Sequence, residues 1–237
     1  MKTSVLLICL LFAAPVGADD HVTIVKDAFE SLSTDFHEEW AFTHASTEDD
    51  VELIGRYDPS RFESERWKLI SVSGQEPTAD ESADYSRGMA DEFKDDDEES
   101  DDGIIDYESL VLIKDTPAFR VYRFSPNFGH EDDEDDDVGA KILRHVEGTL
   151  TIVRDGNYVQ SIELRNERPI RPIFSVKIKE FLTHLQFGPA NGVGPIVPLS
   201  VEVEITGRAA LVVKIDERES VRFTEYERID PGTSPSL

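Results

Sequence analysis

The stretch that decides the fold is Val197–Ile229, "VPLSVEVEITGRAALVVKIDERESVRFTEYERI". Apolar and polar residues alternate along most of it, which is the period of a β-strand with one buried face. We expect strands at Leu199–Thr206, Ala209–Ile215 and Val221–Tyr226. Gly207-Arg208 is interpreted as the turn between the first two of them.

The same period continues toward the N-terminus as far as Tyr107. The strands expected there are Tyr107–Ile113, Phe119–Phe124, Val146–Val153, Tyr158–Leu164 and Ile173–Phe181. Asp155-Gly156 predicts a hairpin turn, because this dipeptide suits the positive φ angles of a two-residue loop. Eight successive strands without intervening helices exclude a doubly wound parallel sheet and favour one large antiparallel sheet.

Two helices and three strands are expected before this run. Apolar residues recur at helical spacing over Val22–Phe36, with Asp20 as the N-cap. Thr78 and Glu81 form a capping box, which starts a second helix. Short strands are expected at Trp40–His44, Val51–Tyr57 and Trp67–Val72. The predicted class is therefore α+β, mainly β: a large curved antiparallel sheet, or half-barrel, with about two helices covering its concave face.

The beginning of the chain has the layout of a secretory signal peptide over residues 1–18, with a basic residue, an apolar run and small residues before Asp19. Cys9 is the only cysteine, and it lacks the small preceding residues of a lipobox, so neither a disulfide nor a lipid anchor is expected. Residues 19–230 are expected to form one domain, and 231–237 a flexible tail. The predicted location is periplasmic or secreted, with no transmembrane segment.

The formal net charge of −26 argues against a nucleic-acid partner and disfavours an anionic membrane surface. Two acidic blocks contribute much of this charge. Residues 91–102 contain nine acids, and 131–137 are seven acids in a row. Such blocks repel themselves and stay solvated, so we expect both to be loops.

The segment Glu98–Leu110, "EESDDGIIDYESL", is similar to the loop of an EF-hand calcium site. The residues at ligand positions would be Glu98, Ser100, Asp102 and Asp106. The twelfth position, which requires a bidentate glutamate, is Ser109, and a strand is expected where an EF-hand has its exit helix. A solvated loop leading into a strand is the favoured interpretation, with weak calcium binding as the alternative.

No pattern for catalysis emerges from the sequence. Nucleophile elbows, phosphate-binding loops and dinucleotide fingerprints are absent, and the histidines are scattered. We therefore expect neither an enzyme nor a cofactor. The segment "RNERPIRP" brings Arg165, Arg168 and Arg171 together, and these either balance charge at a rim or capture an acidic group.

Two segments carry a family resemblance: "RYDPSRFESERWKLISVSGQEPT", Arg56–Thr78, and the C-terminal run quoted above. With the signal peptide and the antiparallel strands, they resemble the lipoprotein-carrier superfamily typified by LolA and LolB, in particular secreted bacterial members with similar segments. The resemblance implies an incomplete barrel whose concave apolar face receives acyl chains beneath covering helices. Its partner would be a lipid or a lipoprotein.

These observations predict a non-enzymatic envelope protein that binds a lipid, an acyl chain or an apolar protein segment in a half-barrel cavity. The alternative is an acidic structural or interaction protein with an occluded core, which binds calcium weakly. Candidate residues of the cavity wall are Trp40, Phe42, Trp67, Leu69, Tyr85 and Met89. Aromatic residues on strands of this kind are also common core residues.

Overall fold

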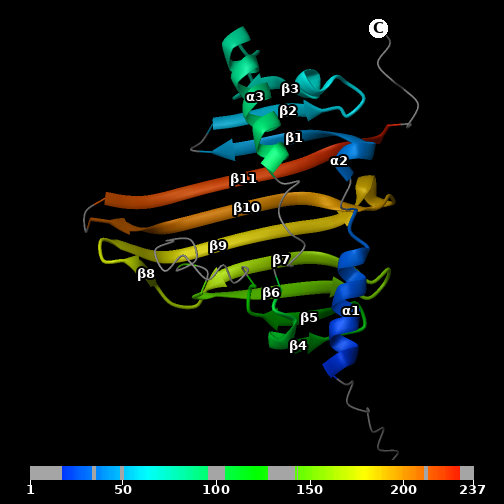
Figure 1. The fold of residues 1–237 in the computed structure, drawn as a ribbon, viewed down its shortest axis with the longest axis vertical. Helices are drawn as coiled ribbons and strands as arrows, with labels where there is room; N and C mark the ends of the chain where they lie inside the picture. The colour runs from blue at the N-terminus through cyan, green and yellow to red at the C-terminus, as the bar shows by residue number, and fades with distance from the viewer. Residues whose placement is uncertain are drawn as a thin grey trace, which may run out of the picture.

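A computed structural model describes residues 18–33, 36–48, 51–95, 105–127, 142, 144–210 and 213–229. The predicted signal peptide before Ala18, the acidic run 131–137 and the predicted tail 231–237 lie outside the described residues, as does the second part of the acidic block 91–102, from residue 96. The described chain forms one antiparallel sheet of 11 strands with three α-helices (Figure 1). The predicted class, α+β and mainly β, is confirmed.

Along the described chain, two helices precede three strands, and a third helix precedes the remaining eight strands. The helices are α1 (Ala18–Glu30), α2 (Phe36–Glu39) and α3 (Ala79–Asp95). The strands are β1 (Trp40–Glu48), β2 (Val51–Tyr57), β3 (Trp67–Val72), β4 (Val111–Asp115), β5 (Phe119–Phe124), β6 (Val146–Val153), β7 (Tyr158–Asn166), β8 (Ile170–Ile173), β9 (Val176–Pro189), β10 (Ile196–Ala209) and β11 (Val213–Arg228). Short 3-10 turns are η1 (Glu63–Glu65), η3 (Tyr107–Ser109) and η4 (Ala190–Gly192).

The strand order across the sheet is β3-β2-β1-β11-β10-β9-β7-β6-β5-β4, with β8 paired to β9 beside this path. The sheet does not close, because β3 and β4 form its two edges. Helix α1 contacts β7 near one edge, and α3 contacts β3 at the other. In Figure 1 the two helices accordingly lie at opposite ends of the row of strands.

The first helix is shorter than predicted. It runs from Ala18 to Glu30, so Asp20 lies inside it and is not its N-cap. The hydroxyl of Ser31 donates to the carbonyl of Ala28 at 2.6 Å, and Leu32 then forms a parallel bridge with Ile196. This contact with the sheet takes the chain out of the helix before the separate helix α2 begins.

The second helix begins as predicted and continues further. The amide of Glu81 donates to the Thr78 hydroxyl at 3.3 Å, and the Glu81 carboxylate accepts from the Thr78 amide at 2.8 Å. Helix α3 then extends to Asp95, so the first part of the acidic block 91–102 is helical. That part of the loop prediction is wrong, because acidic residues tolerate a helix that is already capped and packed.

The C-terminal strands are longer and fewer than predicted. Gly207 does not turn the chain: it lies within β10, where it pairs with Ile178 of β9 and Ile215 of β11. A Cβ at Gly207 would lie 2.5 Å from the carbonyl oxygen of Lys177, so the glycine permits a close approach at an irregularity of the ladder. The turn comes at Ala210, whose φ is +47°.

Of three other predicted boundaries, one is confirmed and two differ in the structure. The hairpin at Asp155-Gly156 is confirmed: it joins β6 to β7, and Gly156 has a φ of +87°. The strand expected at Ile173–Phe181 is divided into β8 and β9, which pair across Ile173 and Val176. The strand expected from Tyr107 starts later, at Val111, because η3 precedes it.

Two groups of buried side chains form the core. The helix cluster lies between α1 and strands β5 to β7, and consists of Val25, Ala28, Ile105, Tyr122, Phe124, Val146, Leu150, Ile152, Val159, Ile162 and Leu164. The aromatic cluster lies at the β1–β3 end of the sheet and consists of Phe42, Tyr57, Trp67, Ala190, Val197 and Tyr226. Each end of the sheet thus has its own packed centre.

Candidate functional site

The six residues predicted for the cavity wall gather at one end of the sheet. Phe42 and Trp67 are buried members of the aromatic cluster, with 0 % and 4 % of their surfaces exposed. Trp40, Tyr85 and Met89 pack against this cluster and are partly buried. Leu69 is 4 % exposed and lies on β3, paired with Gly55. The structure therefore brings these residues together as densely packed core.

Ring contacts explain why this cluster is tight. The Phe42 ring lies 5.1 Å from Tyr57, 5.9 Å from Trp67 and 5.7 Å from Tyr226, measured between ring centroids. These separations are typical of stacked and edge-to-face pairs. The Tyr226 hydroxyl donates to the Pro198 carbonyl, and burial raises the pKa of Tyr226. The aromatic cluster is thus an occluded core.

A buried histidine links this cluster to helix α3. His44 of β1 is 5 % exposed, and its Nδ1 lies 3.3 Å from the Tyr85 hydroxyl. Burial disfavours the charged imidazolium and lowers the pKa of His44. Gly55, which pairs with His44, leaves the space that the Tyr85 hydroxyl occupies. His44, Gly55 and Tyr85 together therefore position α3 on the sheet, and the burial of His44 favours its neutral imidazole.

The strand register identifies a second, less covered surface, the apolar band. Residues paired directly across neighbouring strands lie on one face of a sheet. Leu185 of β9 pairs with Val201 of β10, which pairs in turn with Val221 of β11. Alternation along the strands places further aliphatic and aromatic residues on that face. The apolar band consists of Phe181, Leu185, Val201, Val203, Ile205 and Val221, all partly buried.

The apolar band lies between the two clusters and on the same face. Leu185 pairs with Ile162 of the helix cluster, and both Leu185 and Phe181 pack against that cluster. On the other side, Phe223 packs against the aromatic cluster and lies two residues from Val221 on β11. The face that carries α1 and α3 therefore presents a continuous apolar strip across the middle of the sheet.

One margin of the apolar band is acidic. Glu217 and Glu219 of β11 pair with Ile205 and Val203, so they lie on the same face as the band. Both glutamates are exposed. A ligand on the band would therefore meet negative charge along β11.

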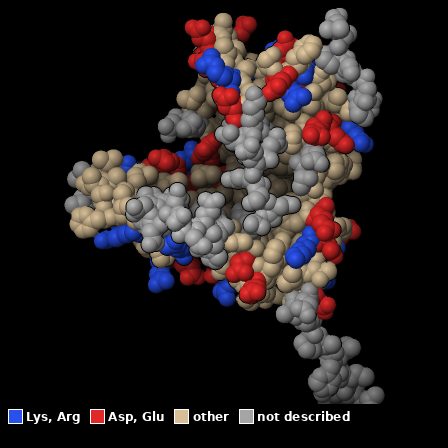
Figure 2. Space-filling model, viewed as in Figure 1, with Lys and Arg blue, Asp and Glu red and all other residues tan. Residues whose placement is uncertain are grey.

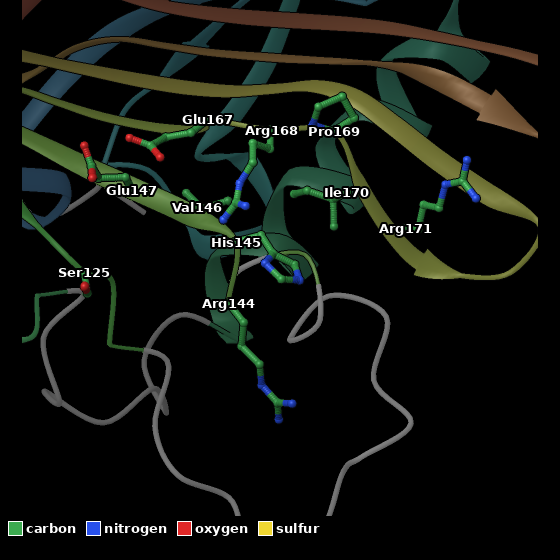
Figure 3. A pocket seen from close by; sticks show the side chains of 10 residues that line it. All are labelled: Ser125, Arg144, His145, Val146, Glu147, Glu167, Arg168, Pro169, Ile170 and Arg171. Atoms are coloured by element: carbon green, nitrogen blue, oxygen red, sulfur yellow. The ribbon is translucent and has the colours of Figure 1, made fainter.

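Basic residues line a hollow near the opposite margin, which we call the arginine hollow. It has a volume of about 420 Å³ and lies where β6 begins and β7 leads into β8 (Figure 3). Its main lining residues are Arg144, His145, Val146, Arg168, Ile170 and Arg171. Figure 2 shows blue side chains gathered around the β8 end of the molecule, although acidic residues predominate in the chain.

The arginine hollow is held in place by one asparagine. Asn166, the last residue of β7, donates through Nδ2 to the carbonyls of Arg168 at 2.8 Å and Lys179 at 3.2 Å. Its Oδ1 accepts from the amide of Phe181 at 2.6 Å. Val146 and Ile170 are buried and form an apolar floor. The turn that carries Arg168 is therefore fixed against β9.

The sequence identified this site only in part. Arg168 and Arg171 line the hollow, as the grouping in "RNERPIRP" suggests, whereas Arg165 lies beside Glu163, 3.7 Å from its carboxylate. Arg144 and His145 were missed, because pairing of Val146 with Asn166 brings them to the same place from a distant segment. The only signal for them was two basic residues soon after the acidic run.

The calcium prediction falls largely outside the described residues, where Glu98, Ser100 and Asp102 lie. Asp106 is described and has a structural role: its carboxylate accepts from the Glu108 amide at 3.0 Å and caps η3. Over the described part of the chain, no three His, Cys, Asp or Glu side chains are grouped to hold a metal ion. Nor is any helix in that part long and apolar enough to cross a membrane.

Comparisons with family models, with curated proteins and with solved structures gave no significant match to this chain.

Proposed function

We propose that this protein is a non-enzymatic binding protein of the cell envelope or the secreted fraction, and that it holds the acyl chain of a lipid on the apolar band. The observation that carries the proposal is the band itself: six partly buried apolar residues on the face shared with both clusters. The resemblance to LolA and LolB carriers supports the same assignment.

The dimensions of the band suit an acyl chain. Val201 and Ile205 are four residues apart on β10, which corresponds to about 13 Å along a strand. An extended segment of about ten methylenes covers that length. Each CH₂ group removed from water contributes about 0.8 kcal/mol, so complete burial of such a segment contributes about 8 kcal/mol, which corresponds to micromolar binding, and half-burial corresponds to millimolar binding. A ligand that is held by burial of its acyl chain requires no catalytic residue.

A second candidate function is an acidic structural or interaction protein with an occluded core. The packing of the aromatic cluster favours it, because Phe42 and Trp67, which were predicted to line the cavity, are buried against each other. The two functions differ in their use of the band: the first needs apolar ligands to reach it, and the second does not.

Displacement of a fluorescent fatty acid by unlabelled lipid tests the proposal. Val203→Asn introduces an amide into the band, and Glu202→Asn is the matched control on the opposite face of the same strand. We expect saturable binding by the wild type and by Glu202→Asn, with at least tenfold weaker binding by Val203→Asn. Val221→Asn on β11 should behave like Val203→Asn, and thermal melting confirms that each variant folds.

Absence of saturable binding by the wild-type protein would reject the lipid function and favour the occluded interaction protein. Equal binding by Val203→Asn and Glu202→Asn would place the ligand elsewhere than on the band. An apolar peptide that displaces the probe, where no lipid does, would identify a protein segment as the ligand.

A further inference from the structure

We propose that the arginine hollow binds the anionic head group of the ligand whose acyl chain lies on the apolar band. The inference rests on the proposed function and narrows it: the ligand is an anionic amphiphile, with a phosphate or a carboxylate joined to an acyl chain. Three independent features of the structure support this assignment.

The first feature is positive charge without an ion-pair partner among the described residues. The described residues supply no ion-pair partner within 4.0 Å for Arg144, Arg168 or Arg171. Two glutamates also line the hollow, Glu147 and Glu167, and the first lies 3.7 Å from Arg123. In a chain with 50 acidic residues and 24 lysines and arginines, three arginines at one hollow that have no ion-pair partner among the described residues are unusual. Guanidinium groups bind phosphates and carboxylates through paired N–H donors.

The arrangement of the side chains suits an anion entering from solvent. In Figure 3 the guanidinium of Arg168 points from the β7–β8 turn toward Val146 and His145, whereas the Arg144 side chain points outward, away from these residues. Arg144, His145 and Arg168 are all exposed, so a charged group can reach them without losing all of its water. The floor of the hollow, Val146 and Ile170, is apolar and buried. An anion would therefore contact the polar side chains at its rim.

The second feature is continuity between the hollow and the band. Val146 forms part of the floor of the hollow and also belongs to the helix cluster, against which Phe181 and Leu185 of the band pack. Asn166 binds the Arg168 carbonyl and the Phe181 amide with one side chain. One molecule can therefore place its head in the hollow and its chain on the band.

The third feature is the opposite charge at the two margins of the band. Glu217 and Glu219 make the β11 margin acidic, whereas the hollow beyond β7 is basic. An anionic head group is repelled at the first margin and attracted at the second. The ligand is therefore bound in one direction.

Calorimetric titration of the full chain tests the inference with three ligands of one chain length: tetradecyl phosphate, tetradecanoate and tetradecanol. We expect the wild type to bind at least one of the two anions about tenfold more tightly than the alcohol, as one charge-assisted contact provides. The variants Arg168→Gln and Arg144→Gln should lose this preference. Arg222→Gln, an exposed arginine on β11, is the matched control and should retain it. The two anions distinguish phosphate from carboxylate.

Each outcome bears on a different claim. If the wild type binds none of the three ligands, the proposed function fails and the head-group site fails with it. If the wild type binds anion and alcohol equally, or if Arg168→Gln keeps the preference, the band remains a lipid site and the head-group assignment is wrong. Inorganic phosphate that binds as tightly as tetradecyl phosphate would also overturn the assignment, because the hollow would then act independently of the band.

Discussion

Replacing Trp67 by alanine removes a large side chain from the centre of the aromatic cluster. Trp67 is 4 % exposed, and its ring lies 4.7 Å from Tyr57 and 5.9 Å from Phe42 between centroids. Deletions of this size in a core cost about 3–5 kcal/mol, and loss of the ring contacts with Tyr57, Phe42 and His44 places this variant at the upper end. We expect the free energy of unfolding to fall by about 4 kcal/mol, and the melting temperature by roughly 8–16 °C for a domain of this size.

Urea unfolding followed by far-ultraviolet circular dichroism measures this loss directly, whereas fluorescence would change with the tryptophan itself. Trp40→Ala is the matched control, because Trp40 is only partly buried and its ring lies 6.4 Å from its nearest described partner, Tyr226. It should cost less than half as much. A loss below 1 kcal/mol for Trp67→Ala would show that Trp67 does not support the core, and the occluded packing described above would be wrong.

Four further substitutions probe the fold. Burial lowers the pKa of His44, so below about pH 6.5 the unfolded chain takes up a proton that the folded chain resists. The free energy of unfolding should therefore fall between pH 7 and pH 5, and it should fall less steeply in His44→Phe. Urea midpoints measured at each pH test this. Gly207→Ala should lower the melting temperature, because its Cβ would lie 2.5 Å from the Lys177 carbonyl oxygen. Gly88 of α3 has open space around it, so Gly88→Ala should raise the free energy of unfolding by up to about 1 kcal/mol. Asn166→Ala leaves the Phe181 amide without its acceptor and should cost about 1–3 kcal/mol in urea unfolding.

Local features were the ones that the sequence predicted well. The capping box of Thr78 and Glu81 and the turn at Gly156 each depend on residues within a few positions of one another, and both are present. Gly207 was misinterpreted because its reason lies on another strand, in the approach of the Lys177 carbonyl. A glycine needed for a turn and one needed for a close approach look alike in sequence.

For the candidate site, too, the sequence predicted the local features and missed those that depend on pairing between distant strands. Alternation on β10 predicts that Val201 and Val203 share a face, but only the register shows that Leu185 and Val221 continue it across three strands. The arginine hollow likewise combines a local group around Arg168 with a distant one. The net charge of −26 argued against nucleic-acid and anionic-membrane partners, but a sum over the chain says nothing about a local cluster of arginines.

The pairing of β1 with β11 has a consequence for how the chain folds. Trp40 lies opposite Arg228, so strands from the two ends of the domain meet in the middle of the sheet. Such contacts have a high contact order, which is typical of folding in milliseconds to seconds. Until the 16 residues of β11 are available, β1, β2 and β3 have no neighbour that links them to the other strands of the sheet. During synthesis, Phe42 therefore lacks its contacts with Phe223 and Tyr226 until β11 has been made.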